Sequence, residues 1–397
     1  MWNIFSIIVT VSLTVFLGFY MSYYALCRWY IRKKKAPPET RFKEEELPRV
    51  SVIIPVYNEA KVLASKFDSL GKLNYPKDKL EIVYVDGGST DESVEMIRSY
   101  GKDLGFECKV VLQGSRMGFN SAVRAGFSQT TGDIIFITGA ETQFDSEVLR
   151  VVVQHFVDET IGAVTGRQVI SNRDKGFSPK MEVAYRSLYD FVREAESGMD
   201  SPFDLKGEIS AARKSVLLHL VQKKALLNRG CIDCCFSFQA KIDGYRTIYE
   251  PNAFYYEFSP GSLRESLRQT TRRATTLIQN MIVFKSMILN KNYGLFGLVI
   301  MPAHFLMLTL LPLLFALGSI GLIVSVLLEP SYISIIVLGL GVFSVVASSR
   351  VRAFVKIQLV LIPAIVGLVS MDTQKFKRLE STRSVQSTTA AFSVDKS

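Results

Sequence analysis

The sequence predicts a mixed α/β domain held between hydrophobic helices at its two ends. An uncharged apolar run lies near the start of the chain, and a longer hydrophobic region lies near its end. Between them, short runs rich in β-branched residues alternate with helical patterns, which is typical of βαβ units around a largely parallel sheet. Hydrophobic residues make up 48% of the 397 residues, an excess that a membrane-embedded protein explains.

The apolar run near the start, residues 4–26, carries no charged side chain and is long enough to cross a bilayer as a helix. It is followed directly by basic residues, among them Arg28 and Arg32. A cleaved signal peptide carries its positive charge before the apolar run, so we interpret residues 1–27 as a retained transmembrane helix. The positive-inside rule then places the basic, Pro-containing linker of residues 28–48 in the cytoplasm, with the following domain.

The central globular segment is expected over residues 49–292. Strands are predicted where β-branched runs are bounded by turn residues, at residues 50–56, 80–85, 108–112 and 133–138. Helices are predicted between them at residues 59–70 and 91–101. A further helix near residues 262–280 is expected to lie at the membrane interface.

The second hydrophobic region, residues 293–372, is expected to form a C-terminal transmembrane region with two to four spans. Residues 295–328 exceed the length of one span and contain Pro302 and Pro312, so we expect a kinked helix there. Residues 333–347 and 354–371 are further candidates. Three spans would put the polar, basic tail of residues 373–397 outside, against the positive-inside rule. Either the third segment is re-entrant or the first run folds back.

The charge balance points to a membrane partner. Lys plus Arg total 47 against 37 Asp plus Glu, a surplus of +10 that suits nucleic acid or an anionic membrane surface. Much of the positive charge lies beside the apolar runs, and no aromatic-interleaved basic motif typical of nucleic-acid binding stands out. We therefore expect contact with membrane lipids and no nucleic-acid partner.

The five cysteines are too few for a disulfide scaffold and fit a reducing compartment. Three of them, Cys231, Cys234 and Cys235, form a CxxCC group that suggests a metal or redox site. A structural zinc site needs four ligands, and the three histidines are scattered along the chain. We therefore favour the interpretation that these cysteines are small buried residues.

Polar residues follow the first two predicted strands. The first strand ends in Pro55, Tyr57 and Glu59, and the second ends in Asp86 and two glycines. Ligands bind outside the carboxyl ends of strands in an open parallel sheet, so both groups are expected at one edge. Asp86 would accept hydrogen bonds from uracil or another base, and the glycines would let the backbone approach the ligand. The segment DGGSTD is equally compatible with a turn followed by a helix N-cap.

These segments, "SVIIPVYNEA" and "EIVYVDGGSTDES", resemble the opening of the family 2 glycosyltransferases. Further similar segments follow in the family's order. The segment "GSRMGFNSAVRAGFSQTTGDIIFITGAET" resembles the family's Gly-rich helix and the strand after it, and "DLKGEISAARK", with Glu208, resembles its acceptor-binding loop. The segment "GCIDCCFSFQAKIDGYRTIYEPNAFYYE" resembles the part that carries its acceptor-side acid, and "RQTTRRATT" resembles the QxxRW segment of membrane-bound synthases. The resemblance covers about residues 50–276. It implies a GT-A fold that binds a nucleotide-diphosphate sugar, as in polysaccharide synthases and polyprenyl-phosphate glycosyltransferases.

The resemblance places the family's metal-binding DxD motif on Gly139, Ala140 and Glu141, so the first carboxylate is missing. Glu141 would hold Mg²⁺ or Mn²⁺ together with phosphate oxygens and water, because Mg²⁺ often takes only one or two protein carboxylates. The cation would neutralise the departing diphosphate. The alternative is that Glu141 is a polar loop residue.

The family's catalytic base falls on Asp233, upstream of the GYR sequence that starts at Gly244. It would take the proton of an acceptor hydroxyl, or orient the acceptor if that were an ionised lipid phosphate. The alternative is an N-cap to a helix starting near Phe236. The donor is expected to contact Pro55, Tyr57, Glu59, Asp86, Gly118, Gly139, Gln269 and Arg272.

The QxxRW segment becomes Gln269, Arg272 and Arg273 here, so its aromatic residue is missing. Arg264, Arg268 and Arg272 recur every four residues and would share one helical face. That face would bind the leaving diphosphate or anionic headgroups, unless it is a plain solvated helix.

The combined expectation is an inverting glycosyltransferase whose catalytic domain faces the cytoplasm at the cell membrane. It would transfer a sugar from a nucleotide-diphosphate sugar to a lipid-linked or polysaccharide acceptor. The missing tryptophan favours single addition over a processive polysaccharide synthase. A catalytically inactive, membrane-bound partner subunit is a further alternative. A dinucleotide-dependent oxidoreductase is disfavoured, because no GxGxxG follows the first strand.

Overall fold

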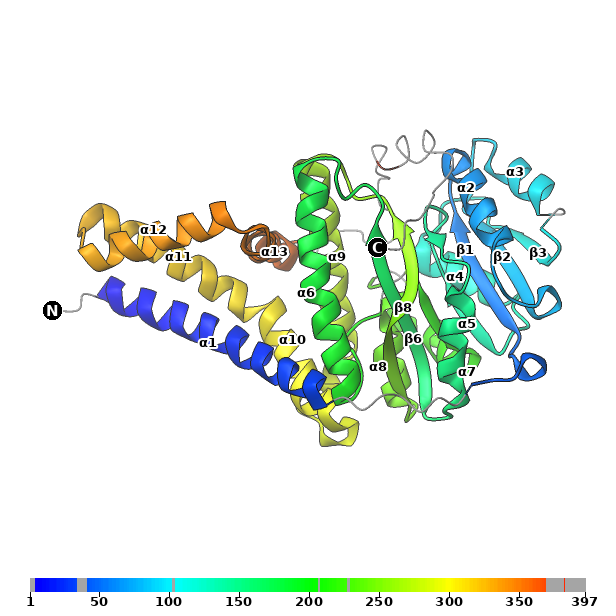
Figure 1. The fold of residues 1–397 in the computed structure, drawn as a ribbon, viewed down its shortest axis with the longest axis horizontal. Helices are drawn as coiled ribbons and strands as arrows, with labels where there is room; N and C mark the ends of the chain where they lie inside the picture. Colours follow the sequence, from blue (N-terminus) through cyan, green and yellow to red (C-terminus); the bar gives the residue numbers. More distant parts are fainter. Residues whose placement is uncertain are drawn as a thin grey trace.

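A sheet domain and a group of apolar helices make up the computed structural model, which describes residues 4–33, 41–101, 104–205, 208–226, 229–368 and 382. Two long helices, α6 (Phe177–Met199) and α9 (Leu263–Val283), stand between the sheet and the apolar helices (Figure 1). Residues 34–40 of the predicted linker lie outside the described residues, as does the predicted polar tail apart from residue 382.

The described strands form one mixed sheet in the order β3-β2-β1-β4-β7-β6-β8-β5. Their bounds are β1 Val50–Val56, β2 Leu80–Asp86, β3 Glu107–Leu112, β4 Ile134–Ile137, β5 Gln143–Phe144, β6 Ile161–Ile170, β7 Ser210–Arg213 and β8 Arg246–Glu257. The four strands predicted from the sequence are β1 to β4, and they pair in parallel. They place the carboxyl ends of β1, β2 and β4 at one edge.

The largely parallel sheet expected from the sequence is found in four of the seven strand pairings, β6 with β8 among them, and the other three are antiparallel. β7 runs antiparallel to β4 and to β6, and β5 runs antiparallel to β8. β7 has the sequence SAAR, which is short and contains no β-branched residue, so its pattern does not predict a strand. Its place in the sheet comes from contacts between distant parts of the chain.

Helices cover both faces of this sheet. They are α2 Ala60–Gly71, α3 Ser93–Tyr100, α4 Phe119–Phe127, α5 Val148–Val153, α7 Lys214–Gln222 and α8 Phe236–Ile242. Alternate strand residues enter two separate hydrophobic clusters: Ile53 and Val83 belong to one, Val52 and Ile54 to the other. This burial on both faces explains why the parallel strands read as continuous apolar runs. It also fixes which loops emerge at each edge.

The apolar helices are α1 Ile4–Lys33, α10 Met301–Leu308, α11 Leu310–Leu328, α12 Tyr332–Ala347 and α13 Ser349–Val366. Among the described residues, two helices are long and apolar enough to cross a membrane, at Ser6–Lys33 and Leu310–Leu328. α12 and α13 meet at an angle of 108°, which fits a broken span or a re-entrant loop. α1 continues six residues beyond the predicted boundary at residue 27, so Arg28 and Arg32 are helical.

The run predicted as one kinked helix over residues 295–328 is divided in the structure. A short π-helix (Phe296–Ile300) leads into α10, and α11 begins after Thr309. The break lies three residues before Pro312, whose ring clashes with the carbonyl four residues earlier in a continuous helix. α10 also packs near α9, so this part of the run belongs to the junction with the sheet domain.

α9 connects the sheet domain to α13 through packing and hydrogen bonds. The Thr275 hydroxyl donates to the Ala364 carbonyl over 3.3 Å, and the Lys356 ammonium donates to the Ser266 hydroxyl over 2.6 Å. α13 also packs against α6. The two parts of the molecule therefore share α6 and α9 as a common wall.

The irregular pairing of β6 with β8 requires a glycine at position 166. The register shifts between Thr165 and Arg167, and a Cβ at Gly166 would lie 2.3 Å from the Ala253 carbonyl oxygen. We expect Gly166→Ala to lower the free energy of unfolding by about 1–3 kcal/mol, because the backbone must move to admit the methyl group. Thermal unfolding in detergent measures this change.

The control for this prediction is Gly198→Ala on α6. A Cβ at Gly198 meets no atom within 4 Å, and the residue is exposed. Alanine should therefore stabilise the helix there by up to about 1 kcal/mol. Equal melting temperatures for Gly166→Ala and the wild type would show that the β8 backbone yields without cost.

Candidate active site

The loops that follow β1, β2 and β4 meet at one edge of the sheet. Val56 pairs with Asp86 at the ends of β1 and β2. The Thr138 N–H, just after β4, donates to the Ile53 carbonyl over 3.1 Å. The expected grouping of Pro55, Tyr57 and Asp86 at one edge is therefore present, with the loop of Gly139 and Glu141 beside it.

Asp86 is buried and organises its own turn. Its carboxylate accepts hydrogen bonds from the backbone N–H groups of Gly88 (2.9 Å) and Ser89 (3.1 Å), and from the Ser89 hydroxyl. Gly88 has a φ of +81°, which favours glycine. The turn interpretation of DGGSTD is thus correct as a description of the backbone. It also presents the Asp86 carboxylate at the sheet edge in a fixed orientation.

The β1 and β2 loops are bound to each other. Asn58, at a φ of +52°, accepts from the Thr90 N–H over 2.6 Å and donates its own N–H to the Ser89 hydroxyl over 2.8 Å. Glu59 is buried at the start of α2, and its N–H donates to the Ser93 hydroxyl over 2.7 Å. These bonds make the two loops one rigid surface.

A cationic side chain lies over this surface. The Arg116 guanidinium carbon is 4.5 Å from the centre of the Tyr57 ring. Arg116 precedes Gly118, which has a φ of +96° and stands directly before α4. A planar cation on an aromatic ring next to a helix N-terminus makes this corner suitable for an anionic ligand.

Glu141 lies in the loop after β4, folded back over Gly139. A Cβ at position 139 would be 2.8 Å from one Glu141 carboxylate oxygen. The space that a side chain at position 139 would take is therefore filled by the Glu141 carboxylate. Because Gly139 has no side chain, the Glu141 carboxylate can lie where the first carboxylate of the motif would begin.

A buried lysine supports the Glu141 loop from below. Lys66 on α2 donates to the Thr142 carbonyl over 2.7 Å and lies near the Thr138 hydroxyl, at 3.4 Å. Its ammonium is 4.2 Å from the centre of the Phe144 ring. Burial lowers the pKa of Lys66 to about 7, although the Glu141 and Glu257 carboxylates oppose this shift.

Lys66 should make stability depend on pH in a defined direction. Since its folded pKa is about 7 and its unfolded pKa is near 10.5, the unfolded chain binds more protons between these values. Stability should therefore rise with pH across this window, by at most about 1.4 kcal/mol per pH unit. We expect the wild type to gain melting temperature relative to Lys66→Met between pH 7.5 and 9.5.

Lys72→Met is the matched control, because this ammonium is exposed and pairs only with Asp68 at the surface, over 2.6 Å, among the contacts described. Its melting temperature should follow that of the wild type at every pH. A constant difference between wild type and Lys66→Met would contradict the lowered pKa of Lys66.

Carboxylates continue from Glu141 toward the acceptor side. Glu257, at the end of β8, accepts hydrogen bonds from the Thr142 hydroxyl (3.1 Å) and from the Gln168 amide. Burial raises the pKa of Glu257 well above its usual range, and the nearby Glu208 and Glu141 carboxylates raise it further. Arg273 opposes this shift and forms an ion pair with Glu208 at 2.9 Å.

Asp233 lies at the other end of this series. It is buried on the short 3-10 turn Asp233–Cys235, and its carboxylate accepts from the Cys234 N–H over 2.8 Å. Burial raises the pKa of Asp233, and Glu208 adds to the shift. The alternative N-cap role is wrong, because Cys235 stands in the N-cap position of α8 without a side-chain bond.

The segment of Asp233 is bound to α4 as well. The Ile232 N–H donates to the Asn120 side-chain oxygen over 3.0 Å, and Asn120 lies two residues after Gly118. Asn120 therefore links the Asp233 turn to the Gly118 corner, and the charge of Glu208 acts on the pKa of both Asp233 and Glu257. Residues 206–207 of the predicted acceptor-binding loop lie outside the described residues.

The predicted arginine row on α9 divides in two. Arg264 and Arg268 are exposed, whereas Arg272 is half-buried and close enough to Asp233 and Glu208 for their charges to act on its pKa. Burial lowers the pKa of Arg272, and Arg273 lowers it further. Gln269 lies one turn before Arg272 on the same helix. The arginines of this row therefore extend from the exposed start of α9 to the candidate site at Arg272.

Sequence reasoning did not single out Lys66 or Glu257, and it named Glu208 only within the segment that resembles the family's acceptor-binding loop. Lys66 occupies the apolar stripe of α2, between Leu63 and Leu70, so helical spacing alone indicates an unusual buried lysine. Glu257 shares the buried face of β8 with Tyr255, two residues earlier. The helical spacing of α2 and the alternation along β8 therefore indicate both buried residues from the sequence alone.

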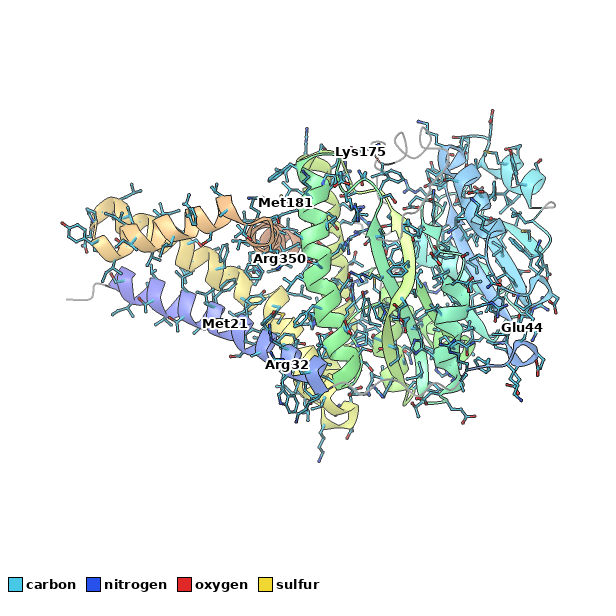
Figure 2. The ribbon with its side chains drawn as sticks, in the orientation of Figure 1. Met21, Arg32, Glu44, Lys175, Met181 and Arg350 are labelled. Carbon is cyan, nitrogen blue, oxygen red and sulfur yellow. The ribbon has the colours of Figure 1, made fainter. Side chains whose placement is uncertain are left out.

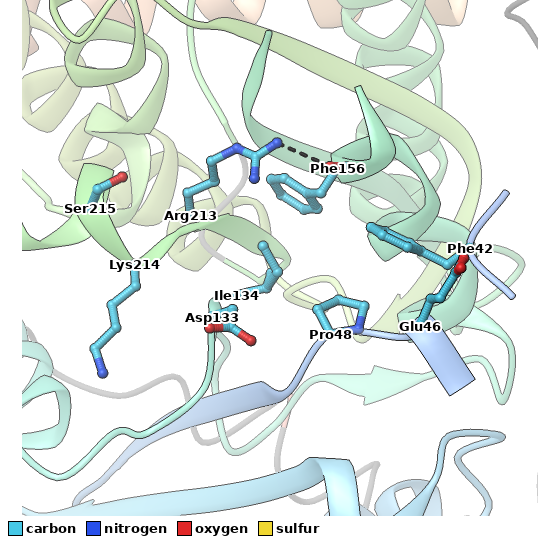
Figure 3. A pocket seen from close by; sticks show the side chains of 9 residues that line it. All are labelled: Phe42, Glu46, Pro48, Asp133, Ile134, Phe156, Arg213, Lys214 and Ser215. Atoms are coloured by element: carbon cyan, nitrogen blue, oxygen red, sulfur yellow. Dashed lines mark hydrogen bonds between the residues drawn. The ribbon is translucent and has the colours of Figure 1, made fainter. Parts of the chain in front are cut away.

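A separate cavity of about 370 Å³ opens at the opposite edge of the sheet (Figure 3). Pro48 and Asp133, which precede β1 and β4, line it, and the Arg213 guanidinium donates there to the Phe156 carbonyl over 3.0 Å. None of the predicted site residues is among its lining residues. The candidate site therefore rests on the grouping at the carboxyl ends of the strands.

Comparison with known proteins agrees with this geometry. Residues 51–221 match the family described as Glycosyl transferase family 2. The chain is 28% identical over 255 residues to the probable glycosyltransferase YdaM of Bacillus subtilis (strain 168), covering 62% of this chain and 59% of that protein. It is 25% identical over 231 residues to a poly-beta-1,6-N-acetyl-D-glucosamine synthase of Staphylococcus aureus (strain COL), covering 58% and 55%.

These alignments span less than two thirds of the length of either relative. Among solved structures, the fold is similar to that of the mannosyltransferase PcManGT from Pyrobaculum calidifontis, in complex with GDP-Man and Mn²⁺. The TM-score is 0.79 at 24% identity, covering 92% of this chain and 99% of that chain. The predicted α/β fold class and the resemblance are confirmed, although Asp233 and α9 lie beyond the matched residues 51–221.

Proposed function

We propose that this chain, which contains a glycosyltransferase family 2 domain with the GT-A fold, transfers a sugar from a nucleotide-diphosphate sugar to a lipid-linked or glycan acceptor. The observation that carries the proposal is the series Glu141, Glu257, Glu208 and Asp233, in which Glu141 and Glu208 raise the pKa of Glu257 and Glu208 raises that of Asp233. It runs from the loop after β4 to the acceptor-side turn. A donor bound at the strand ends would reach both.

The donor nucleotide is assigned to the surface formed by the β1 and β2 loops. Asp86 would accept hydrogen bonds from the base, because its carboxylate is already held in place by Gly88 and Ser89. Tyr57 and Pro55 would flank it. Arg116, above the Tyr57 ring, is placed to meet negative charge. The GDP-Man of the similar mannosyltransferase supports a GDP- or UDP-sugar as the donor class.

The diphosphate is assigned to the Glu141 loop, where Mg²⁺ or Mn²⁺ fits the oxygen donors present. The Glu141 carboxylate, which lies against Gly139, would be the protein ligand, and phosphate oxygens and water would supply the other ligands. When bound, the cation neutralises charge on the departing diphosphate. Lys66 holds the loop from below, and Arg272 would meet the diphosphate from the acceptor side.

Asp233 is assigned as the general base. In an inverting transfer its carboxylate removes the acceptor proton as the hydroxyl oxygen attacks the anomeric carbon. The raised pKa of Asp233 makes the carboxylate a stronger base, and Arg272 beside it favours the ionised form. With an already ionised lipid phosphate as acceptor, Asp233 would orient the acceptor instead.

The membrane assignment rests on α1 and α11. Met21, midway along α1, is exposed among other apolar side chains, whereas Arg32 lies at the end of the helix nearest the sheet domain (Figure 2). Basic residues on that side support a cytoplasmic catalytic domain at the cell membrane. Two or three candidate spans and the loss of the QxxRW aromatic residue favour single addition over a processive synthase.

The test is an assay of the full chain, purified in detergent, with GDP- and UDP-sugars, Mg²⁺ or Mn²⁺, and polyprenyl-phosphate or glycan acceptors. We expect acceptor-dependent release of the nucleoside diphosphate and one added sugar per acceptor. Ladders of long products would favour the processive synthase. Absence of release with every donor, while the protein still binds a nucleotide, would favour the inactive partner subunit and overturn the proposal.

A further inference from the structure

Two thiols and one carboxylate meet at the turn before α8. The sulfur atoms of Cys231 and Cys234 and one carboxylate oxygen of Asp233 all lie within 4.8 Å of one another. Among the described residues, this is the one group of three or more His, Cys, Asp or Glu side chains whose ligand atoms lie close enough to hold a metal ion. The sequence disfavoured a metal for want of a histidine, and the structure supplies a carboxylate instead.

The donors suit a tetrahedral cation. A zinc ion with Zn–S bonds of about 2.3 Å separates its sulfur ligands by about 3.8 Å, so the three side chains need only a small adjustment. Thiolates favour zinc-class cations over Mg²⁺ or Mn²⁺, which prefer oxygen. Three protein ligands leave the fourth position to water.

The backbone beneath the cluster is held from two helices. The Cys231 N–H donates to the Asn280 side-chain oxygen over 2.9 Å, and the Gly230 N–H donates to the Gln279 side-chain oxygen, also over 2.9 Å. From α4, Asn120 accepts from the Ile232 N–H over 3.0 Å. These bonds fix the turn that presents the three donors, which is the arrangement a preorganised metal site needs.

The charges around the cluster also suit a metal. Two thiolates and one carboxylate around a divalent cation leave a single net negative charge. The Arg272 guanidinium, which feels the charges of Cys231 and Asp233, offsets it. A buried charge is tolerated when it is paired in this way.

We propose that Cys231, Asp233 and Cys234 bind one zinc-class divalent cation, and that this cation inhibits transfer by occupying the Asp233 carboxylate. On binding, the two thiols release their protons to solvent as two S–Zn bonds form, with no change of oxidation state. The inhibition rests on the proposed role of Asp233 as the base. The binding of the metal does not.

Metal binding is tested on the full chain in detergent, stripped of metal and kept reduced by a phosphine. Co²⁺ reports thiolate ligation by its absorption, and Zn²⁺ affinity is measured against a chromophoric chelator. We expect one Zn²⁺ per chain, bound at least about 100-fold more weakly in Cys231→Ser and in Cys234→Ser, since even outer-shell changes cost 10–100-fold.

Cys108→Ser, which removes a half-buried thiol from β3, is the matched control and should bind Zn²⁺ as the wild type does. Thermal unfolding identifies any serine variant that fails to fold, and Asp233→Asn then replaces it in the comparison. Equal Zn²⁺ affinity in the folded ligand variants and the wild type, or no binding to the wild type, would overturn the metal site.

Inhibition is tested separately. The double variant Cys231→Ser, Cys234→Ser should transfer sugar in the absence of zinc and resist Zn²⁺ concentrations that stop the wild type. Equal inhibition of both would place the inhibiting ion elsewhere, for instance at the Glu141 loop, and would overturn the inhibitory role. A protein that binds Zn²⁺ but transfers no sugar would refute the proposed function and leave the metal site standing.

Discussion

Exchanging Asp233 for asparagine is expected to slow sugar transfer to a hydroxyl acceptor by about 10²–10⁴-fold, the contribution typical of a positioned general base. Asparagine keeps the size of the side chain and can still accept from the Cys234 N–H. It cannot take up the proton of the attacking hydroxyl. Donor binding should therefore change little while kcat falls, and the release of nucleoside diphosphate measures this.

Asp243→Asn serves as the control for this experiment. Asp243 lies ten residues later, and its carboxylate contacts His219 at 2.9 Å, away from the series of acidic groups at the site. Its replacement should leave the transfer rate within about twofold, because its described contacts, with His219 and with the Gln239 amide, lie outside that series. A rate for Asp233→Asn equal to that of the wild type would remove Asp233 as the base.

Exchanging Glu141 for glutamine is expected to raise the Mn²⁺ or Mg²⁺ concentration for half-maximal rate at least about tenfold. The second-order rate constant kcat/KM should fall by about 10²–10³-fold, because charge on the leaving diphosphate is no longer neutralised. Glutamine preserves the packing over Gly139. Binding of Mn²⁺ in the presence of a nucleoside diphosphate, followed by electron paramagnetic resonance, separates loss of the cation from loss of fold.

Glu147→Gln is the matched control, because this carboxylate accepts from the Asn74 amide at the surface, over 2.8 Å. Its cation requirement should not change. If Glu141→Gln kept the cation requirement of the wild type, the cation would have to be held by other oxygen atoms, and the role given to Glu141 would be wrong.

The strand-end part of the site could be predicted from the sequence because its geometry is local. Asp86 and Tyr57 follow runs that are apolar on both faces, and parallel pairing brings such ends together. Glu141 was singled out by the resemblance to the family's DxD motif, and it lies just after β4. In each case the residue ends its strand or follows it within four positions, so the position of the strand decides where the side chain emerges.

The acceptor side could be predicted only in part because it is assembled from distant segments. Glu208 lies two residues before β7 and Glu257 at the end of β8, and their proximity follows from the antiparallel insertion of β7, which no sequence periodicity predicts. Their coupling to Asp233 depends on burial that arises only in the folded domain. The CxxCC spacing suggested a metal at Cys231 and Cys234, but the carboxylate of Asp233 becomes a third donor only through the turn that the folded domain forms.

The shared helix α9 has a consequence for how this protein should be handled. Its middle carries Arg272 and Arg273 at the candidate site, while the hydrogen bond donated by Thr275 and the one accepted by Ser266 join it to α13 among the apolar helices. In the proposed membrane arrangement, a change in acyl-chain length or detergent that tilts α13 should reach the two guanidinium groups through these bonds. The choice of solubilising lipid should then affect the rate of sugar transfer as well as the stability of the fold. We expect this rate to change stepwise in nanodiscs whose lipids differ in acyl-chain length.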